Sequence, residues 1–425
     1  MSVKRRSNKS DMTIDAKDFN VLRKLAGRVA ETAALPVQEE KRELWRRLNG
    51  LNPVRPMVMI DQVCWNEMNV DDELTLQCND AECRGFEEWF RRKIFQWEHF
   101  PVDMVIEAFF PVAKAVKNTR FDVQVIEETA ETDPDNNVRG HKYANQFQTE
   151  KDLEKIYPPE VRHDETETAR RVEKAESIFG DILEIRETGV NPYISLWDPL
   201  AMWMGVENAL YALVDRPDYM HCLLGRMTDG YLEILDQLEE KGLLCRPQST
   251  IHCTGAYTDE LPGEGYNPDR PRARDIWVFG LAQMFSSISP DMFREFEVDY
   301  TARICERFGL VYYGCCDPLD GKMNEVRMIP NVRKVSMSPW VDEARGAAET
   351  GGGFVYSRKP NPALLAMTRF DGDAVRNEFA ATLKVCGEQG CPVEFILKDL
   401  STVSYEPQRL FDWAQIAMEM VCDQG

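Results

Sequence analysis

Two adjacent cysteines and one histidine are the residues of this chain whose types and positions best suit a reactive centre. Cys315 and Cys316 follow one apolar run, and His252 lies in another. A thiolate and an imidazole are typical ligands of zinc, and the chain has only five histidines. We therefore predict that His252, Cys315 and Cys316 bind zinc. The alternative is that these cysteines and Cys253 are small apolar fillers of the core, because no Cys-x-x-Cys or His-x-Cys spacing is present.

Carboxylates, aromatic residues and further polar residues follow other apolar runs of the chain. Glu67, Glu107 and Asp399 are candidates for a general acid or for groups that orient a polar substrate. For any single aromatic or methionine residue, the alternative is an ordinary place in the core. The predicted substrate-binding residues are Trp65, Trp197, Met202, Tyr257, Arg358 and Asn361.

Short apolar runs separated by helical patterns provide the elements that would position these residues. The predicted strands are 56–61, 102–107, 193–197, 249–253, 310–314, 332–337, 353–357 and 392–397. Strands that alternate with helices form a parallel sheet. Eight of them in one chain predict an α/β fold with a closed (β/α)8 TIM barrel, whose chemistry lies at the carboxyl ends of the strands.

The remaining segments predict one domain with additions. Residues 1–15 are polar and basic, which is typical of a disordered terminus. Apolar residues at helical spacing over 16–50 predict an N-terminal helical extension. The polar, charged segment 115–190 predicts an insertion or a surface helical excursion rather than a separate domain. We therefore expect a single barrel domain over 16–425, with insertions at its mouth.

Composition excludes several classes of partner. Acidic residues outnumber basic ones by 72 to 51, which gives a formal net charge of −21 and argues against nucleic acid and against an anionic membrane surface. The sequence contains neither a signal peptide nor an apolar run of about 18 residues. The twelve cysteines form no dense disulfide framework. We expect a reduced, cytoplasmic protein.

Several segments occur in the order and spacing of a known family over residues 40–420. The most specific is Ser289-Pro-Asp-Met-Phe-Arg-Glu-Phe296, which is similar to a SPxxFxEF segment of that family. The others are Arg42-Glu-Leu-Trp-Arg-Arg-Leu-Asn-Gly50, Val54-Arg-Pro-Met-Val58, Trp197-Asp-Pro-Leu-Ala201, Gly205-Val-Glu-Asn208, Asp215-Arg-Pro-Asp218 and Asn361-Pro-Ala-Leu-Leu365. In these segments the chain resembles the uroporphyrinogen decarboxylase superfamily, whose fold is a (β/α)8 barrel.

The resemblance implies one of two branches, true decarboxylases or zinc-dependent, corrinoid-linked methyltransferases. The decarboxylases carry a paired-arginine segment after the first strand, whereas residues 59–68 contain no arginine. The methyltransferases carry a His-x-Cys-Gly segment after the fifth strand. Here Cys316 takes the cysteine position, Gly314 takes the histidine position, and the family's second cysteine falls near Lys398. Either the ligand set is rearranged, with His252 and Cys315 or Cys253 beside Cys316, or no metal is bound.

The resemblance therefore implies a methyltransferase that moves a methyl group between a small methylated substrate and a corrinoid protein. The substrate would be of the methoxyaromatic or methylamine type, and zinc would act as a Lewis acid. The corrinoid (cobalamin) would be supplied by the partner protein, and the enzyme would be a homodimer. One alternative is a metal-independent decarboxylase or lyase of the same superfamily that acts on a small carboxylated substrate. A second is a non-catalytic relative that binds a small molecule or a protein.

Overall fold

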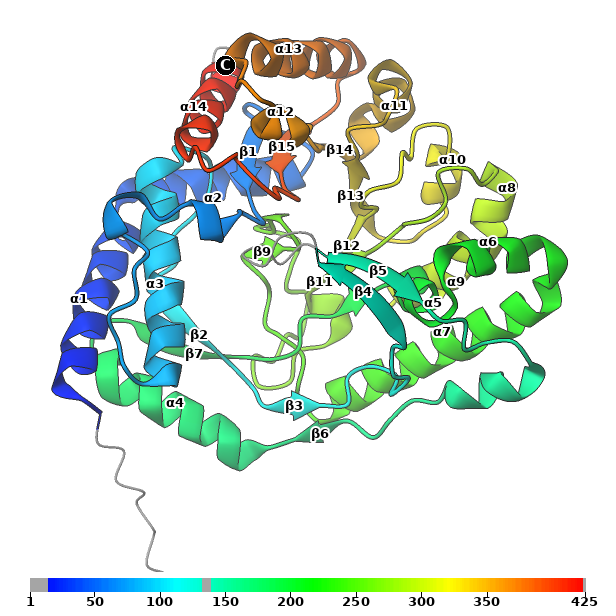
Figure 1. Cartoon of the computed structure of the whole chain (residues 1–425), viewed down its shortest axis with the longest axis horizontal. Coiled ribbons are helices and arrows are strands. Elements are labelled where there is room, and N and C mark those ends of the chain that lie inside the picture. Colours follow the sequence, from blue (N-terminus) through cyan, green and yellow to red (C-terminus); the bar gives the residue numbers. More distant parts are fainter. Residues whose placement is uncertain (1–13, 132–138, 423–425) are drawn as a thin grey trace, which may run out of the picture.

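A parallel sheet lies at the centre of the computed structural model, which describes residues 14–131 and 139–422 (Figure 1). Seven strands of the described chain pair in the order β1-β15-β14-β13-β12-β11-β8, and every pairing among them is parallel. They are β1 (Met57–Ile60), β8 (Tyr193–Ile194), β11 (Trp277–Gly280), β12 (Leu310–Tyr313), β13 (Val332–Met337), β14 (Val355–Arg358) and β15 (Val393–Leu397). The predicted disorder over 1–15 falls almost wholly outside the described residues.

Six of the predicted strands are confirmed, because their apolar runs become strands of this sheet. β1, β11, β12, β14 and β15 are buried at every residue. Burial on both faces is typical of parallel sheets covered by helices, and it explains why β1 and β12 are apolar at every position rather than alternating.

Helices surround the sheet, as Figure 1 shows. The predicted N-terminal helical extension is present as the first two of them. Ser289 caps α8 through a hydrogen bond that its side chain accepts from Met292 N, as expected for a serine that precedes proline at a helix start. The helices are α1 (Ala16–Ala33), α2 (Pro36–Asn49), α3 (Ala81–His99), α4 (Glu165–Phe179), α5 (Trp197–Met204), α6 (Val206–Asp215), α7 (Pro217–Glu240), α8 (Pro290–Phe293), α9 (Asp299–Cys305), α10 (Met323–Val326), α11 (Glu343–Thr350), α12 (Ala363–Ala366), α13 (Gly372–Gln389) and α14 (Gln408–Cys422).

One predicted strand is absent, a second forms a strand that does not join the main sheet, and one strand of the main sheet was missed. Residues 102–107 form no strand, although Asp103 N donates to Val58 O at 2.9 Å and so places this segment beside β1. Residues 249–253 do not join the main sheet. The strand that takes their place is β11, which has only four residues and follows the polar segment 272–275.

Residues 249–253 instead begin a hairpin that packs against the main sheet. β9 (Thr250–Ile251) pairs antiparallel with β10 (Thr254–Gly255). A fully buried ion pair of 2.6 Å joins Lys334 on β13 to Glu394 on β15, and β14 lies between these two strands in the sheet. Thr254 Oγ1 donates to the Glu394 carboxylate at 2.8 Å, and Lys334 Nζ donates to Gly255 O at 3.0 Å. The hairpin therefore packs against β13 and β15 of the sheet, and closure of this sheet into a barrel stays a prediction.

The polar segment 115–190 contains more strand than expected. β2 (Phe109–Ala113) pairs parallel with β7 (Glu184–Thr188). Two antiparallel pairs join β3 (Val116–Lys117) to β6 (Arg162–His163) and β4 (Glu127–Glu131) to β5 (Arg139–Tyr143). These pairs lie outside the main sheet, so the prediction of a surface helical excursion was only partly right.

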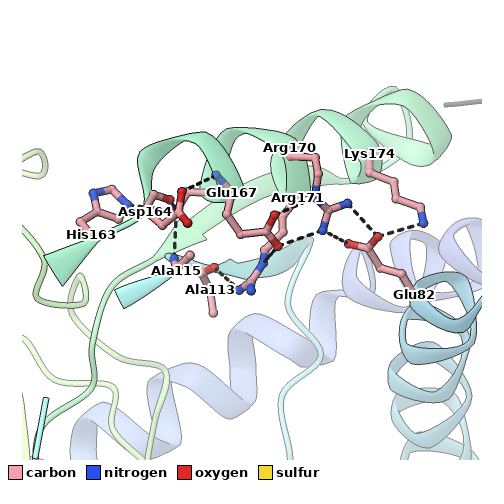
Figure 2. A network of polar contacts seen from close by, with 10 residues as sticks. Glu82, Ala113, Ala115, His163, Asp164, Glu167, Arg170, Arg171 and Lys174 are labelled. Atoms are coloured by element: carbon pink, nitrogen blue, oxygen red, sulfur yellow. Dashed lines mark hydrogen bonds and ion pairs between the residues drawn. The ribbon is translucent and has the colours of Figure 1, made fainter. Parts of the chain in front are cut away.

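Ion pairs attach helix α4 of this segment to α3 (Figure 2). Glu82 near the start of α3 accepts from Arg170 at 3.0 Å and from Lys174 at 2.9 Å. Glu167 binds Arg170 and Arg171 from one turn earlier in α4. The shared carboxylates fix α4 against the N-terminal helices, which contact it through α1 as well.

All twelve cysteines are free thiols. Within the described residues, we find no helix with the length and apolar character needed to span a bilayer.

Candidate functional site

Cys315 and Cys316 lie in the loop that follows β12, and their sulfur atoms are 3.5 Å apart. Side chains of adjacent strand residues would point to opposite faces, but the strand ends at Tyr313, and Gly314 turns the chain with a φ of 91°. A Cβ at Gly314 would lie 2.6 Å from the Leu319 side chain, so this turn requires glycine. The turn is what allows both thiols to come together.

His252 reaches the same place from the tip of the β9–β10 hairpin. It has a φ of 51°, a left-handed backbone that costs about 1 kcal/mol for a residue with a side chain. Its ring stacks on Phe279 of β11, with 4.0 Å between the ring centroids and 11° between the planes. The stacking fixes the orientation of the imidazole.

Lys398 joins the histidine to the cysteines. It follows β15 and is only 5% exposed. Its Nζ lies 3.2 Å from His252 Nε2 and 3.4 Å from Cys315 Sγ. We call the side chains of His252, Cys315, Cys316 and Lys398 the strand-end centre. Asp399 Oδ2 lies 3.3 Å from Lys398 Nζ at its edge.

The groups of the strand-end centre shift one another's pKa values. A hydrogen bond from the Cys316 thiol outweighs burial and, together with His252 and the charge of Lys398, holds the pKa of Cys315 well below its usual range. Burial opposes the charge on His252, but hydrogen bonds with Cys253 and Cys315 prevail and raise its pKa to about 9. Burial likewise opposes the charge on Lys398, yet the Cys315 thiolate raises the pKa of this amine. At neutral pH the centre therefore holds a thiolate between cationic groups.

Two neighbouring cavities lead to this centre. The inner cavity has a volume of about 110 Å³, and His252 and Cys253 line it. The outer cavity has a volume of about 370 Å³. Both are lined by Lys93, Val105, Ser249 and Thr250. His252 is thus the member of the strand-end centre that a molecule in the inner cavity would meet.

The same geometry tests the predicted zinc site. The ammonium group of Lys398 lies between the imidazole and Cys315, where a shared metal ion would have to sit. Among the described residues, no group of three or more His, Cys, Asp or Glu side chains is arranged to hold a metal ion. His252, Cys315 and Cys316 are brought together as predicted, but in this arrangement they do not fit zinc, whose binding stays a prediction.

Glu107 and Tyr257 meet at a second place, on the walls of the cavities. Tyr257 OH donates to Glu107 Oε1 at 2.6 Å, and Arg42 donates to Glu107 Oε2 at 3.0 Å. Burial, together with the Glu107 charge, raises the pKa of Tyr257. Glu107 lines the outer cavity and Tyr257 the inner one, so both are placed to contact a bound molecule.

Trp65 and Glu67 lie in the segment that follows β1, and neither lines the inner cavity. The Glu67 carboxylate accepts hydrogen bonds from Val403 N at 2.8 Å and Tyr405 N at 2.9 Å, so it anchors the loop after β15. Trp65 lines a separate cavity of about 650 Å³, with the Arg92 guanidinium 5.0 Å from its ring centroid.

The remaining predicted residues serve the packing of the fold. Trp197 is fully buried and donates from Nε1 to a backbone carbonyl, and Met202 packs partly buried against the core. Arg358 is buried in an ion pair of 2.7 Å with Glu343. The Asn361 side chain accepts from a backbone amide two residues later. The core alternative is therefore the better description of Trp197 and Met202.

Three polar residues at the ends of predicted strands, Lys398, Lys359 and Asp198, were given no role in the predicted site but lie near the centre. Lys398 is a member of the strand-end centre. Lys359 donates to Ser357 Oγ at 2.8 Å, and burial lowers the pKa of Lys359. The Asp198 carboxyl has a raised pKa because it is buried and also faces the charge of Cys315. Each follows an apolar run, so its position was the available signal, but no motif distinguished it.

Among solved structures, the chain is similar to a methyltransferase from Methanosarcina mazei. The two share 11% sequence identity with a TM-score of 0.48, over 89% of this chain and 97% of that chain. No family model matches the chain, and no curated protein matches its sequence. A likeness of this extent is no basis for assigning an activity.

Proposed function

We propose that this protein is an enzyme that transfers a methyl group from a small methylated substrate to a corrinoid carried by a partner protein. The observation that carries the proposal is the strand-end centre, in which an imidazole with a raised pKa lines the inner cavity. The segments around Trp197 and Ser289 resemble the uroporphyrinogen decarboxylase superfamily, and the corrinoid-linked methyltransferases of that superfamily support the corrinoid as acceptor.

The chain's own residues would supply the proton that the leaving group of the substrate needs. When the bond between the methyl carbon and an ether oxygen or an uncharged amine nitrogen breaks, the electron pair remains on the heteroatom, which needs a proton to leave. Protonated His252 faces the inner cavity and donates that proton, while the Cys315 thiolate and Lys398 set its charge. When docked, the corrinoid would supply the nucleophile that accepts the methyl carbon.

A set of exposed apolar side chains supports a protein partner. Trp340, Met367 and Tyr405 are 73%, 50% and 62% exposed, and they lie on the loops that follow β13, β14 and β15. These three strands are neighbours in the sheet. Large apolar side chains that cluster on a surface are typical of interaction sites.

The test compares methyl donors that differ in their leaving group. Purified enzyme is mixed with reduced free cobalamin and either a methoxyaromatic, whose oxygen must be protonated, or a quaternary methylammonium compound, whose nitrogen leaves as a neutral amine. His252→Gln should slow transfer from the methoxyaromatic by about 100-fold or more and transfer from the ammonium compound far less. His141→Gln, an exposed histidine on β5, is the matched control.

Absence of methyl transfer from every donor would contradict the proposal. Release of CO2 from a carboxylated substrate without methyl transfer would instead support the metal-independent decarboxylase. Zinc is tested separately by elemental analysis: about one zinc per chain that is lost in Cys316→Ser would establish the predicted metal, and would mean that Lys398 moves aside when it binds.

A further inference from the structure

The outer cavity has the properties of a ligand site. Its volume of about 370 Å³ is that of pockets that bind small molecules. Apolar and aromatic side chains form much of its wall, with a few polar groups that can orient a ligand. The apolar residues are Trp89, Val105, Ile106, Phe109 and Pro111, and the polar ones include Asn191, Gln248, Ser249 and Thr250.

Lys93 on α3 lies where the outer and inner cavities adjoin, because it lines both. Trp89, Lys93 and Gln96 follow one another at helical spacing on the same face of α3, and this face borders the cavities. Within the described chain, neither a hydrogen bond nor an ion pair at contact distance is found for Lys93 Nζ. Burial lowers the pKa of Lys93, and Asp61 opposes this only through its longer-range charge.

Two charged residues that line the outer cavity are already paired. Glu107 binds Arg42 and the Tyr257 hydroxyl. Arg186 lies 3.7 Å above the Phe109 ring and forms an ion pair of 2.7 Å with Glu184. The other charged lining residues, Glu187 and Arg246, are exposed to solvent, whereas burial lowers the pKa of Lys93. An ammonium group in a largely apolar cavity is unfavourable until an anion joins it.

We propose that the outer cavity binds a small molecule that carries a carboxylate on an apolar, ring-sized body, with Lys93 holding the carboxylate at the junction of the two cavities. The ring rests against Trp89 and Phe109. The anchored carboxylate sets which end of the molecule faces His252. This inference rests on the proposed function in that the anchored molecule is the methyl-bearing substrate.

Binding of simple probes tests this without any turnover. Benzoate, phenylacetate and the neutral benzamide are titrated into the full chain, with calorimetry as the readout and tryptophan fluorescence, to which Trp89 contributes, as a second one. We expect benzoate to bind at least tenfold more tightly than benzamide, because a charge-assisted hydrogen bond contributes a factor of this order. Lys93→Gln should remove this difference, Lys93→Arg should keep it, and Lys24→Gln on the exposed side of α1 should change nothing.

Equal affinity of the wild-type protein for benzoate and benzamide would overturn the proposal, and so would absence of binding by every carboxylate probe. It would also be overturned if Lys93→Gln, with benzamide binding intact, still preferred benzoate. Lys93-dependent carboxylate binding in a protein that transfers no methyl group would retain the anchor and reject the methyltransferase. Methyl transfer at an unchanged rate in Lys93→Gln would support the methyltransferase and reject Lys93 as the anchor.

Discussion

Cys315 is a nucleophile kept charged by its surroundings. Its thiolate accepts the Cys316 hydrogen bond and lies 3.4 Å from the Lys398 ammonium group. The same interactions bind the Cys316 proton more tightly and raise the pKa of Cys316. Two cysteines that are neighbours in the chain therefore differ in chemistry: the buried one is the thiolate and the exposed one is the proton donor.

Alkylation at acidic pH should report this difference. At pH 6, iodoacetamide should modify Cys315 while ordinary thiols, whose pKa is near 9, remain almost fully protonated and react slowly. Mass spectrometry of peptides gives the site and rate. Lys398→Met should raise the pKa of Cys315 and slow its labelling at pH 6, whereas Cys222, an exposed cysteine on α7, is the internal reference. Equal rates at Cys315 and Cys222 would contradict the charge assignment.

Glu297 is a buried acid outside the strand-end centre. It lies in a π-helical turn over Arg294–Val298, and its Oε1 accepts from Thr301 Oγ1 at 2.8 Å and Tyr313 OH at 3.0 Å. Its Oε2 is buried and has no hydrogen-bond partner within the described chain. Burial raises the pKa of Glu297 to about 7.

This pKa predicts how stability depends on pH. The unfolded carboxyl releases its proton near pH 4.5 and the folded one near pH 7, so the folded state binds more protons between these values. The free energy of unfolding should therefore be highest below pH 4.5 with respect to this group and fall by about 3 kcal/mol as the pH rises to 7. In urea unfolding, Glu297→Gln should be more stable than wild type at pH 8 but not at pH 4.5. An equal difference at both values would show that Glu297 does not titrate in this window.

At the scale of elements, the β9–β10 hairpin packs against residues of the sheet that in a closed barrel would contact side chains of other strands. The Trp277 indole donates to Ala256 O at 2.9 Å, and Asn49 Nδ2 to Gly255 O at 3.1 Å. The imidazole of the strand-end centre thus stands on a segment that is separate from the main sheet but held by it on several sides.

The close approach of Trp45 to this hairpin gives an element-scale prediction. A Cβ at Gly255 would lie 2.4 Å from the ring of the buried Trp45. Gly255→Ala should therefore lower the free energy of unfolding by about 1–3 kcal/mol and displace His252, which would reduce methyl transfer.

Gly387→Ala is the matched control, because nothing lies within 4 Å of a Cβ there, inside α13. That change should raise the stability by about 0.5–1 kcal/mol. If Gly255→Ala were as stable as wild type, the hairpin would not be tightly packed against Trp45.

The sequence predicts which segments form strands more clearly than which strands pair with one another. Apolar runs such as 310–313 and 393–397 are clear because both faces of these strands are buried. The run at 249–253 also reads as a short strand, yet the hairpin that it begins contacts Glu394 and Lys334, and only tertiary contacts reveal this. β11 was missed because four residues are too few to show a period.

The candidate site was predictable in its reactive groups but not in its electrostatics. Positions after apolar runs indicated Cys315, Cys316 and His252, which the structure brings together. The role of Lys398 depends on distances across strands that lie far apart in the sequence. Arg358 shares this type of position, but its side chain turns toward Glu343 and Glu378 of the surrounding helices instead.

At the scale of the whole molecule, the exposed apolar residues on the loops after β13, β14 and β15 should distinguish a protein partner from a free cofactor. Trp340→Ser should raise the KM for a corrinoid protein of the same organism by about tenfold, as expected for an aromatic side chain central to an interface. The rate with free reduced cobalamin should stay the same. Val214→Ser, a 71% exposed position on α6, is the control. Equal effects of Trp340→Ser on both acceptors would contradict a docking role.

The strand-end centre is assembled from segments that lie far apart in the chain. Lys398 lies 146 residues after His252 and 83 after Cys315, and contacts of such long sequence separation slow folding because loops must close before they form. The charge of Lys398 contributes to the low pKa of Cys315, so part of the reactivity of this sulfur depends on the pairing of β15 with β1 and β14. A partly folded chain in which β15 is unpaired should therefore carry a less reactive Cys315 than the folded protein.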